Sequence, residues 1–445
     1  MPTPTVRTPT TSTATMTTAT MQQAARSARE ASRRLRVMPA TLRDAALRAV
    51  AQEIDRSRNE IQAANARDLE RARADGVAQP LIHRLGLSDS KMAAMDASLR
   101  EVAAAPDPLQ HVDLVRRLDD GLTLTRVTVP IGVLGVIFES RPDALVQIAS
   151  LCIKSGNAAI LKGGSEAAES NRALFDCIQA ALTATGAGFA GALHLATSRD
   201  QIDDLLRMDD LVDLIIPRGS PELVRSIQDR TRIAVLGHAD GICHVYVDAA
   251  CDLDQAVAIV TDAKTEYPAV CNAAETVLVH ADIAERLLPR LRESMPQVEL
   301  RGDERVRALI DVPPAADEDW DTEYLDLILA VRIVDGLQEA IAFINRHGSA
   351  HTDAIVTTDR QAADAFFTQV DSASVLCNCS TRFADGYRFG LGAEVGISTT
   401  RIHARGPVGV EGLTTYAYRL QGDGHVVADY TSGARSFDHR DLPGS

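Results

Sequence analysis

The chain has 445 residues, and at about 150 residues per domain this length predicts two or three domains. Its 46 Lys and Arg residues against 61 Asp and Glu residues give a formal net charge of −15, which argues against nucleic acid or an anionic membrane as the main partner. No apolar stretch approaches the ~18 residues of a membrane span, so we predict none. The seven cysteines are scattered and never spaced C-x-x-C, which is typical of reduced thiols in a cytoplasmic protein without a metal site.

The first part of the chain changes from a low-complexity segment to regular elements. Residues 1–20 are rich in Thr and Pro and lack an apolar period, so we predict disorder there. Helical spacing covers 22–75. From Arg126 onward, short apolar runs alternate with helical stretches, and strands are predicted at 132–138, 158–161, 193–196, 211–216 and 233–236. Such alternation indicates an α/β fold with a parallel, doubly wound sheet.

A second alternating set predicts another α/β domain that begins near residue 240. Its helices are expected at 254–264 and 337–345, and its strands at 276–279, 327–334, 354–356 and 373–376. The boundaries that we predict are a disordered tail at 1–20, a first domain at 21–240, a second domain at 241–408, a returning strand within 409–430 and a loose tail at 431–445.

Two turns between a strand and a helix are candidate phosphate sites. The first comprises Lys162, Gly163, Gly164 and Ser165, and the second comprises Arg218, Gly219 and Ser220. Each places small residues and a cation where open α/β sheets bind ligands, next to a helix N-terminus. The alternative is a pair of ordinary turns with solvated side chains. Because the first turn holds the neutral Ser165 beside Lys162, we predict NADP rather than NAD.

One cysteine differs from the others in its surroundings. Cys271 follows a predicted helix and precedes a strand, in a loop of small and polar residues, Tyr267–Pro268–Ala269–Val270–Cys271–Asn272. A loop thiol close to a cofactor is accessible and open to activation. Cys271 is therefore our candidate nucleophile.

Several motifs in a fixed order resemble those of a known family. They include Phe138–Glu139–Ser140–Arg141–Pro142–Asp143, Val270–Cys271–Asn272–Ala273, Trp320–Asp321–Thr322–Glu323–Tyr324 and Phe389–Gly390–Leu391–Gly392–Ala393–Glu394. Over about residues 22–430 the chain resembles the gamma-glutamyl phosphate reductases, also called glutamate-5-semialdehyde dehydrogenases. These belong to the aldehyde dehydrogenase superfamily. It is also similar to the reductase half of bifunctional pyrroline-5-carboxylate synthetases.

The resemblance implies an aldehyde-dehydrogenase-like fold with an NADP-binding domain, a catalytic domain and a small β flap. The flap is expected to join 122–129 to a strand around 413–419 and to make a homo-oligomer, a dimer or a tetramer. The implied reaction is the NADPH-dependent reduction of L-glutamyl 5-phosphate to L-glutamate 5-semialdehyde through a Cys271 thioester, the second step of proline biosynthesis. Because acyl phosphates are labile, association with a separate glutamate 5-kinase is a further hypothesis.

The resemblance also suggests the residues that hold the ligands. The substrate is expected to contact Arg141, Asp143, Asn378, Ser380, Arg382, His403 and Arg405. The cofactor is expected to contact Leu236, Gly237 and Glu323 in addition to the two turns.

The chain departs from the family pattern at a few positions. Phe343 replaces a usual His, Tyr267 replaces a common Arg, and Asp143 replaces the Asn that would hold an oxyanion in many superfamily members. The stretch that ends in His238 lacks the Glu base of superfamily members that hydrolyse the thioester. This absence favours the reductase over a dehydrogenase that oxidises another semialdehyde. His238 itself is a candidate for proton transfer or a structural residue. A non-catalytic nucleotide-binding protein is the third alternative.

Overall fold

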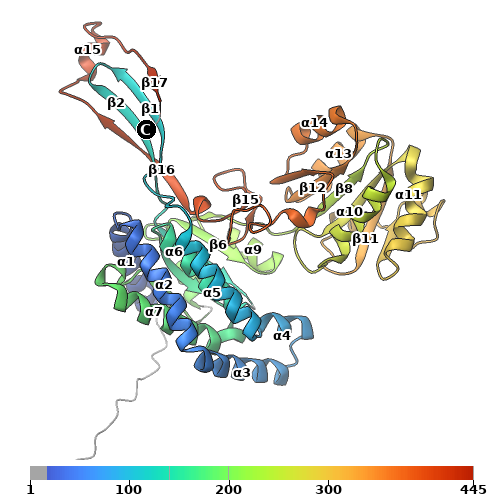
Figure 1. The fold of residues 1–445 in the computed structure, drawn as a ribbon, viewed down its shortest axis with the longest axis horizontal. Helices are drawn as coiled ribbons and strands as arrows, with labels where there is room; N and C mark the ends of the chain where they lie inside the picture. The colour runs from blue at the N-terminus through green and yellow to red at the C-terminus, as the bar shows by residue number, and fades with distance from the viewer. Residues whose placement is uncertain (1–17, 140, 199, 444–445) are drawn as a thin grey trace, which may run out of the picture.

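The computed structural model describes residues 18–139, 141–198 and 200–443. They form two α/β domains and a narrow antiparallel sheet that projects away from both (Figure 1). Within these residues, no helix is both long and apolar enough to cross a membrane. The predicted disordered segment falls outside the described residues, apart from 18–20, which begin the first helix.

The first domain opens with five helices, which confirms the helical spacing seen in the sequence. Their bounds are α1 (Thr18–Leu35), α2 (Ala40–Arg56), α3 (Arg58–Ala74), α4 (Gln79–Leu85) and α5 (Asp89–Ala104). In α2, residues Ala46, Leu47, Val50, Ala51 and Ile54 are buried at helical spacing. This face packs α2 against α5 and α7, so that α5 is held beside the sheet.

The first domain contains a five-stranded parallel sheet in the order β5-β4-β3-β6-β7. Its strands are β3 (Val133–Phe138), β4 (Ala158–Lys162), β5 (Leu193–Ala196), β6 (Leu214–Arg218) and β7 (Ala234–Val235). The crossover helices are α6 (Pro142–Lys154), α7 (Ala168–Thr185), α8 (Asp200–Leu205) and α9 (Pro221–Gln228), with the 3-10 turn η1 at Ser165–Ala167. After β3 the chain adds β4 and β5 on one side of β3, and it then crosses over to add β6 and β7 on the other side. This switch of direction opens a crevice at the carboxyl ends of β3 and β6.

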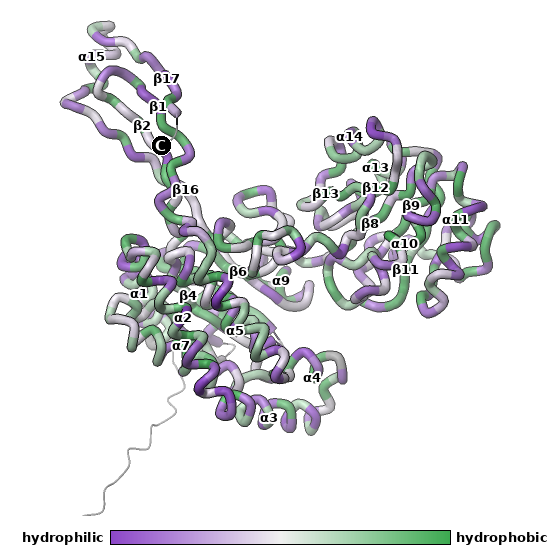
Figure 2. Tube along the Cα trace, in the orientation of Figure 1, coloured by the Kyte–Doolittle hydropathy of each residue, from purple (hydrophilic) through white to green (hydrophobic). Residues whose placement is uncertain are grey.

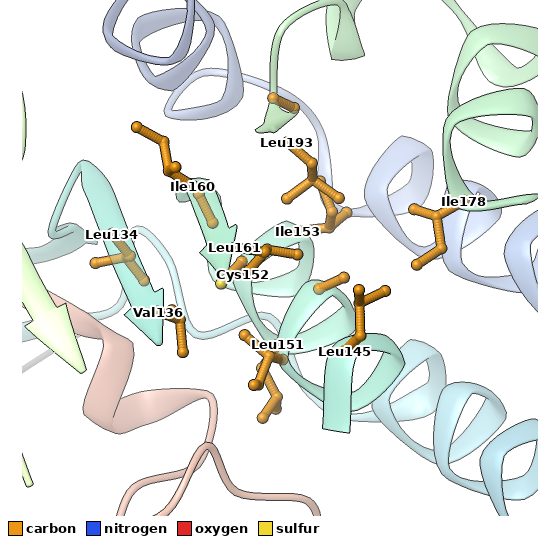
Figure 3. Packing of buried hydrophobic residues seen from close by; sticks show 14 of the residues in the cluster. Leu134, Val136, Leu145, Leu151, Cys152, Ile153, Ile160, Leu161, Ile178 and Leu193 are labelled. Carbon is orange, nitrogen blue, oxygen red and sulfur yellow. The ribbon is translucent and has the colours of Figure 1, made fainter. Parts of the chain in front are cut away.

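The core of the first domain lies between this sheet and the helices that cover it. All six residues of β3 and all five of β4 are buried. Leu134 and Val136 of β3, Ile160 of β4 and Leu151 of α6 lie in one packed group (Figure 3). Along the chain, hydrophobic runs mark the strands and the inner faces of the helices (Figure 2). The five predicted strands are confirmed. They could be predicted because a short hydrophobic run is a local signal in the sequence.

The second domain holds a six-stranded parallel sheet in the order β10-β11-β9-β8-β12-β13. Its strands are β8 (Cys243–Val247), β9 (Ala274–His280), β10 (Glu299–Gly302), β11 (Ile328–Val334), β12 (Thr352–Val356) and β13 (Ser374–Cys377). Its helices are α10 (Leu253–Thr265), α11 (Ala281–Ser294), α12 (Glu304–Arg307), α13 (Leu337–His347) and α14 (Arg360–Gln369). The first strand of this sheet, β8, begins at Cys243, and neither β8 nor β10 was predicted.

The predicted end of the second domain at residue 408 is wrong. Ala393, Val395, Val408 and Leu413 are buried in the hydrophobic core of the first domain. The chain therefore returns to the first domain well before residue 408, through the short strands β14 (Ile397–Ser398) and β15 (Gly406–Pro407).

The projecting sheet, which we call the flap, is antiparallel in the order β16-β2-β1-β17 (Figure 1). Its strands are β1 (Val112–Asp119), β2 (Leu122–Pro130), β16 (Thr414–Gln421) and β17 (Arg440–Leu442), with α15 (Val427–Thr431) between the last two. The pairing of β2 with β16 confirms the predicted flap. The prediction of a loose tail at 431–445 is wrong for its described part, because β17 pairs with β1 and the Arg116 side chain donates to Asp441.

Candidate active site

Cys271 lies in the loop between α10 and β9 and is partly exposed. Burial raises the pKa of each of the other six thiols, which makes them poor nucleophiles. The structure therefore leaves Cys271 as the cysteine best placed for chemistry.

Close contacts hold the Cys271 loop in position. A Cβ at Gly241 would overlap the carbonyl oxygen of Cys271 and lie 2.6 Å from its Cα, so only glycine fits there. The Cys243 thiol donates to the same carbonyl at 3.1 Å, and the Asn272 side-chain amide donates to the carbonyl of Ala384 at 2.9 Å. These contacts fix the thiol to within a small range of positions, as a nucleophile requires.

Two histidines from distant segments face Cys271. A ring nitrogen of His238, a ring nitrogen of His351 and the Cys271 sulfur all lie within 4.8 Å of one another. The two rings meet edge to face, with centroids 4.8 Å apart. His351 is fully buried, and its Nε2 has no hydrogen-bond partner among the described residues. The thiol is therefore flanked by two imidazoles.

A cavity of about 280 Å³ is linked to this cluster by Arg218, which lines the cavity and interacts electrostatically with Cys271. It is bounded by α5, α6, the end of β6 and the segment 385–394. In the cavity wall, Asp143 Oδ2 accepts a hydrogen bond from Arg141 Nη2 at 3.0 Å, while Asp143 Oδ1 is buried and has no partner in the described part of the chain. An unpaired buried carboxylate oxygen is costly unless a ligand supplies a donor. This cavity is therefore suited to a ligand that carries a cation.

Arg218 lies in the same cavity wall, although the sequence analysis assigned it to the cofactor. It interacts electrostatically with Cys271, Asp143 and Glu394, so it stands between the cavity and the thiol. Burial and the neighbouring Arg141 lower the pKa of its guanidinium. Across the described residues, its guanidinium makes no ion pair with a carboxylate. A partly buried cation in this position is suited to an anionic group of a ligand.

The first glycine turn has the geometry expected of a ligand site. Lys162 is buried at the carboxyl end of β4 and donates to the Gly163 carbonyl. A Cβ at Gly163 would overlap the amide of Asn171, so the turn is tight and its backbone is accessible to a ligand. Lys162 and the hydroxyl of Ser165 form a donor set that fits an anionic ribose phosphate. Glu166 brings a carboxyl to the same turn.

Both helix N-termini at the two turns are already capped by carboxylates. Asp68 accepts from the backbone N–H of Glu169 and Ser170 at the start of α7, at 3.2 and 2.8 Å. Glu139 accepts from the backbone N–H of Ser220 at 3.1 Å, at the start of α9. Side chains far away in sequence therefore occupy these three N–H groups, and phosphate binding at the two turns stays a prediction.

Glu323, Leu236 and Gly237 lie near the catalytic loop. The carboxyl of Glu323 accepts a hydrogen bond from the Gly241 N–H, and burial raises its pKa. Leu236 and Gly237 follow β7 directly and precede His238. These predicted cofactor residues therefore lie between the first domain and Cys271.

Asn378 and Ser380 make structural hydrogen bonds away from the cavity. The Asn378 side chain accepts from the Thr357 N–H and donates to its carbonyl, at 2.9 and 2.8 Å. Ser380 accepts from the Arg382 N–H and begins a 3-10 turn at Thr381–Phe383. Asn378 therefore connects the ends of β13 and β12, and Ser380 caps a local turn.

The remaining predicted cations are also engaged elsewhere. Arg382 is buried and pairs with Glu266 at 2.8 Å, and Arg405 pairs with Asp371 at 2.8 Å. His403 is exposed. None of these three lines the cavity, so the structure does not bring them to Arg141 and Asp143.

Several site residues were missed by the sequence analysis. Lys91 of α5 lines the cavity, and its ammonium group donates to the carbonyls of His83, Arg84 and Gly86. Glu394 also lines the cavity, and burial raises its pKa. Glu394 could have been found from the sequence because it ends the motif Phe389–Glu394. Lys91 lies in an ordinary helix, and no motif in the sequence pointed to it.

Two departures from the family pattern have structural positions away from the thiol. Phe343 is buried in the second domain, with ring centroids 5.6 Å from Trp320 and 5.9 Å from His244. Tyr267 is 45% exposed at the start of the Cys271 loop. Phe343 is therefore a packing residue.

Comparison with known proteins agrees with this fold and site. Residues 2–320 match the aldehyde dehydrogenase family, and this match spans more than half of the chain. The chain therefore belongs to the aldehyde dehydrogenase family.

Individual relatives define its place in that family. The chain is 56% identical over 400 residues to the gamma-glutamyl phosphate reductase of Parasynechococcus marenigrum, covering 89% of this chain and 92% of that one. It is 53% identical over 421 residues to gamma-glutamyl phosphate reductase 1 of Synechocystis sp., covering 94% and 97%. The solved structure of the Thermotoga maritima gamma-glutamyl phosphate reductase has a TM-score of 0.89 at 40% identity, covering 91% and 99%. The chain thus groups with the gamma-glutamyl phosphate reductases, which confirms the resemblance of its motifs.

Proposed function

We propose that this chain reduces L-glutamyl 5-phosphate to L-glutamate 5-semialdehyde and phosphate, using NADPH and a thioester on Cys271. This reaction is the second step of proline biosynthesis from glutamate. The observation that carries the proposal is the cavity beside Cys271, which offers one unpaired carboxylate oxygen and one unpaired guanidinium within the described residues.

The charges in the cavity match those of the proposed substrate. Glutamyl phosphate carries an α-ammonium, an α-carboxylate and a phosphate. Asp143 Oδ1 is placed to accept from the ammonium, and Arg141, half exposed beside it, to hold the α-carboxylate. Arg218 lies nearer to the thiol and is placed to hold the phosphate. In this arrangement the acyl carbon faces Cys271.

The thiol then carries out the covalent step. The Cys271 sulfur forms a bond to the acyl carbon, and the carbon–oxygen bond to phosphate breaks with its electron pair on the departing phosphate. The stretch Leu236–Gly237–His238 holds no carboxylate that could activate water, so the thioester persists until it is reduced. The close packing of Gly241 on the Cys271 backbone and the hydrogen bond from the Asn272 side-chain amide to Ala384 hold the loop still through both steps.

Nicotinamide cofactors are general to the aldehyde dehydrogenase family. We assign the ribose phosphate to Lys162 and Ser165, and the nicotinamide ribose to Glu323, beside Leu236 and Gly237. When bound, NADPH supplies the hydride that reduces the thioester. The Glu166 carboxyl also lies at the first turn, so the preference for NADPH over NADH must be measured. The ratio of kcat/KM for NADPH to kcat/KM for NADH tests the assignment of Lys162 directly. We expect the Lys162→Met variant to lower that ratio.

The reverse reaction tests the function. Purified protein is given glutamate 5-semialdehyde and NADP with and without phosphate, beside Cys271→Ala and the matched control Cys379→Ala. We expect NADPH formation that requires phosphate, is lost in Cys271→Ala and is kept in Cys379→Ala. Turnover without phosphate would instead indicate a semialdehyde-oxidising dehydrogenase. Nucleotide binding without any turnover would indicate a non-catalytic protein.

The proposed substrate, L-glutamyl 5-phosphate, is a labile acyl phosphate. We therefore also propose that the chain associates with a separate glutamate 5-kinase that supplies it. A pull-down with that kinase, together with competition by free acyl phosphate, tests it. No association and full competition would contradict it.

A further inference from the structure

A hydrogen bond determines which nitrogen of His238 carries a proton. Nδ1 of His238 lies 2.7 Å from the backbone carbonyl oxygen of Ile397. A carbonyl oxygen only accepts hydrogen bonds, so Nδ1 is the donor. In the neutral ring Nε2 then has no proton and is the basic nitrogen, and a ring nitrogen of His238 lies within 4.8 Å of the Cys271 sulfur.

The surroundings of His238 favour the neutral ring. Burial lowers its pKa, and the nearby Arg218 acts in the same direction. The carboxylates of Glu323 and Asp240 and the bond to Ile397 act in the opposite direction but do not overcome burial. Three further titratable groups face this cluster, namely His351, Cys271 and Glu394.

We propose that Nε2 of His238 is the general base that takes the proton from the Cys271 thiol and then donates it to the departing phosphate. This inference rests on the proposed function only for the second of these transfers. The first is a property of the free protein, which carries the thiol and the imidazole together.

The proton balance of the reaction is consistent with this role. When sulfur attacks the acyl carbon, the S–H proton moves to Nε2, and the imidazolium donates it to the phosphate oxygen as the carbon–oxygen bond breaks. His238 is then neutral again. After hydride addition, the carbon–sulfur bond breaks, and the expelled thiolate takes the one proton from solvent that the overall reduction consumes.

His351 is less suited to the same role. It is fully buried, whereas His238 is partly exposed. Its Nδ1 lies 2.9 Å from Thr352 Oγ1 and 3.7 Å from Cys243 Sγ, and both groups can donate or accept. His238, by contrast, has the carboxylates of Glu323 and Asp240 close by to favour an imidazolium formed during the reaction.

Alkylation of Cys271 tests the inference without substrate or cofactor. The free protein is treated with iodoacetamide between pH 5 and pH 9, and the Cys271 peptide is followed by mass spectrometry. The variants are His238→Asn, whose side-chain amide can still donate to Ile397, and the control His351→Gln. Circular dichroism and thermal melting check that each variant is folded, and His238→Gln serves as a second variant if His238→Asn is not.

In the wild-type protein we expect the rate to rise with pH as His238 loses its proton, at a pH below ~6.5. In His238→Asn this rise should disappear, and the rate at pH 7 should fall at least about tenfold. The His351→Gln profile should match the wild type. An unchanged profile in folded His238→Asn, or loss of the low-pH rise in His351→Gln instead, would overturn the inference. Failure of the reductase assay would leave this result unaffected.

Discussion

At the scale of single residues, the identity of the side chain at position 143 separates two kinds of chemistry. An Asn there would donate to an oxyanion, whereas the ionised Asp143 accepts only. The structure pairs one of its oxygens with Arg141 and leaves the other without a partner among the described residues. We therefore expect Asp143 to bind a cationic group of the substrate rather than to stabilise an oxyanion.

The substitution Asp143→Asn distinguishes these two roles. Loss of a charge-assisted hydrogen bond of ~1.5–3 kcal/mol to the α-ammonium should raise KM for the semialdehyde about ten- to hundredfold. We expect kcat to change little. Steady-state kinetics in the reverse direction measure both, with the exposed Asp229→Asn as a matched control. A higher kcat in Asp143→Asn would support the oxyanion role instead.

Arg218 is a second residue whose charge decides binding. We expect Arg218→Gln to raise the concentration of phosphate needed for half-maximal rate in the reverse reaction by about tenfold or more, because a partly buried guanidinium is lost. Arg218→Lys should recover only part of this effect, since lysine lacks the bidentate fork. The exposed Arg230→Gln, which removes a surface ion pair with Asp203, is the control. A raised KM for NADP with unchanged phosphate dependence would instead indicate that Arg218 binds the cofactor, as the sequence analysis predicted.

At the scale of elements, the segment before β8 and the loop before β9 support each other. Gly241 packs against the backbone of Cys271, and the Cys243 thiol donates to the same loop. The sequence analysis predicted the loop but not β8, because the strand Cys243–Val247 contains the polar His244. That histidine is buried through its 2.8 Å contact with Asp353 of β12, which no local pattern reveals.

The substitution Gly241→Ala tests this support. The new Cβ would overlap the carbonyl oxygen of Cys271, so the loop must move. A displacement of ~1 Å at a nucleophile can lower the rate about a hundredfold. We expect kcat to fall by that order while nucleotide binding is retained. Gly186→Ala, where nothing lies within 4 Å of the new Cβ and the backbone is extended, serves as the control. An active Gly241→Ala enzyme would show that the loop tolerates movement.

At the scale of the whole molecule, the flap stands apart from both domains (Figure 1), and its strand β16 carries a row of exposed apolar side chains. Tyr416, Tyr418 and Leu420 alternate along β16, and each is more than half exposed. A row of this kind on a projecting sheet is suited to pairing with a second copy of the chain, which agrees with the predicted homo-oligomer.

Charges on that face should separate the copies. We expect the double variant Tyr418→Asp and Leu420→Asp to sediment as a monomer, whereas the wild type sediments as a dimer or tetramer. Thr415→Asp, on the opposite face of β16, should keep the wild-type assembly. Analytical ultracentrifugation measures all three. An oligomer that survives the double variant would show that another surface joins the copies.

Local pattern alone determined the alternating elements, the two glycine turns and the Cys271 loop, because hydrophobic period and turn residues act between neighbours in the chain. The pairing of 122–129 with a strand around 413–419 was implied by the family resemblance of the whole sequence and not by local pattern. Only the tertiary structure decided which side chains meet. It placed Cys271 next to His238 and His351, brought Arg218 within electrostatic range of Asp143, and paired Arg382 with Glu266. It also placed Ala393 and Val408 in the first domain and β17 on the flap. These outcomes depend on packing and charge pairing between segments often more than a hundred residues apart, for which a single sequence carries no local signal.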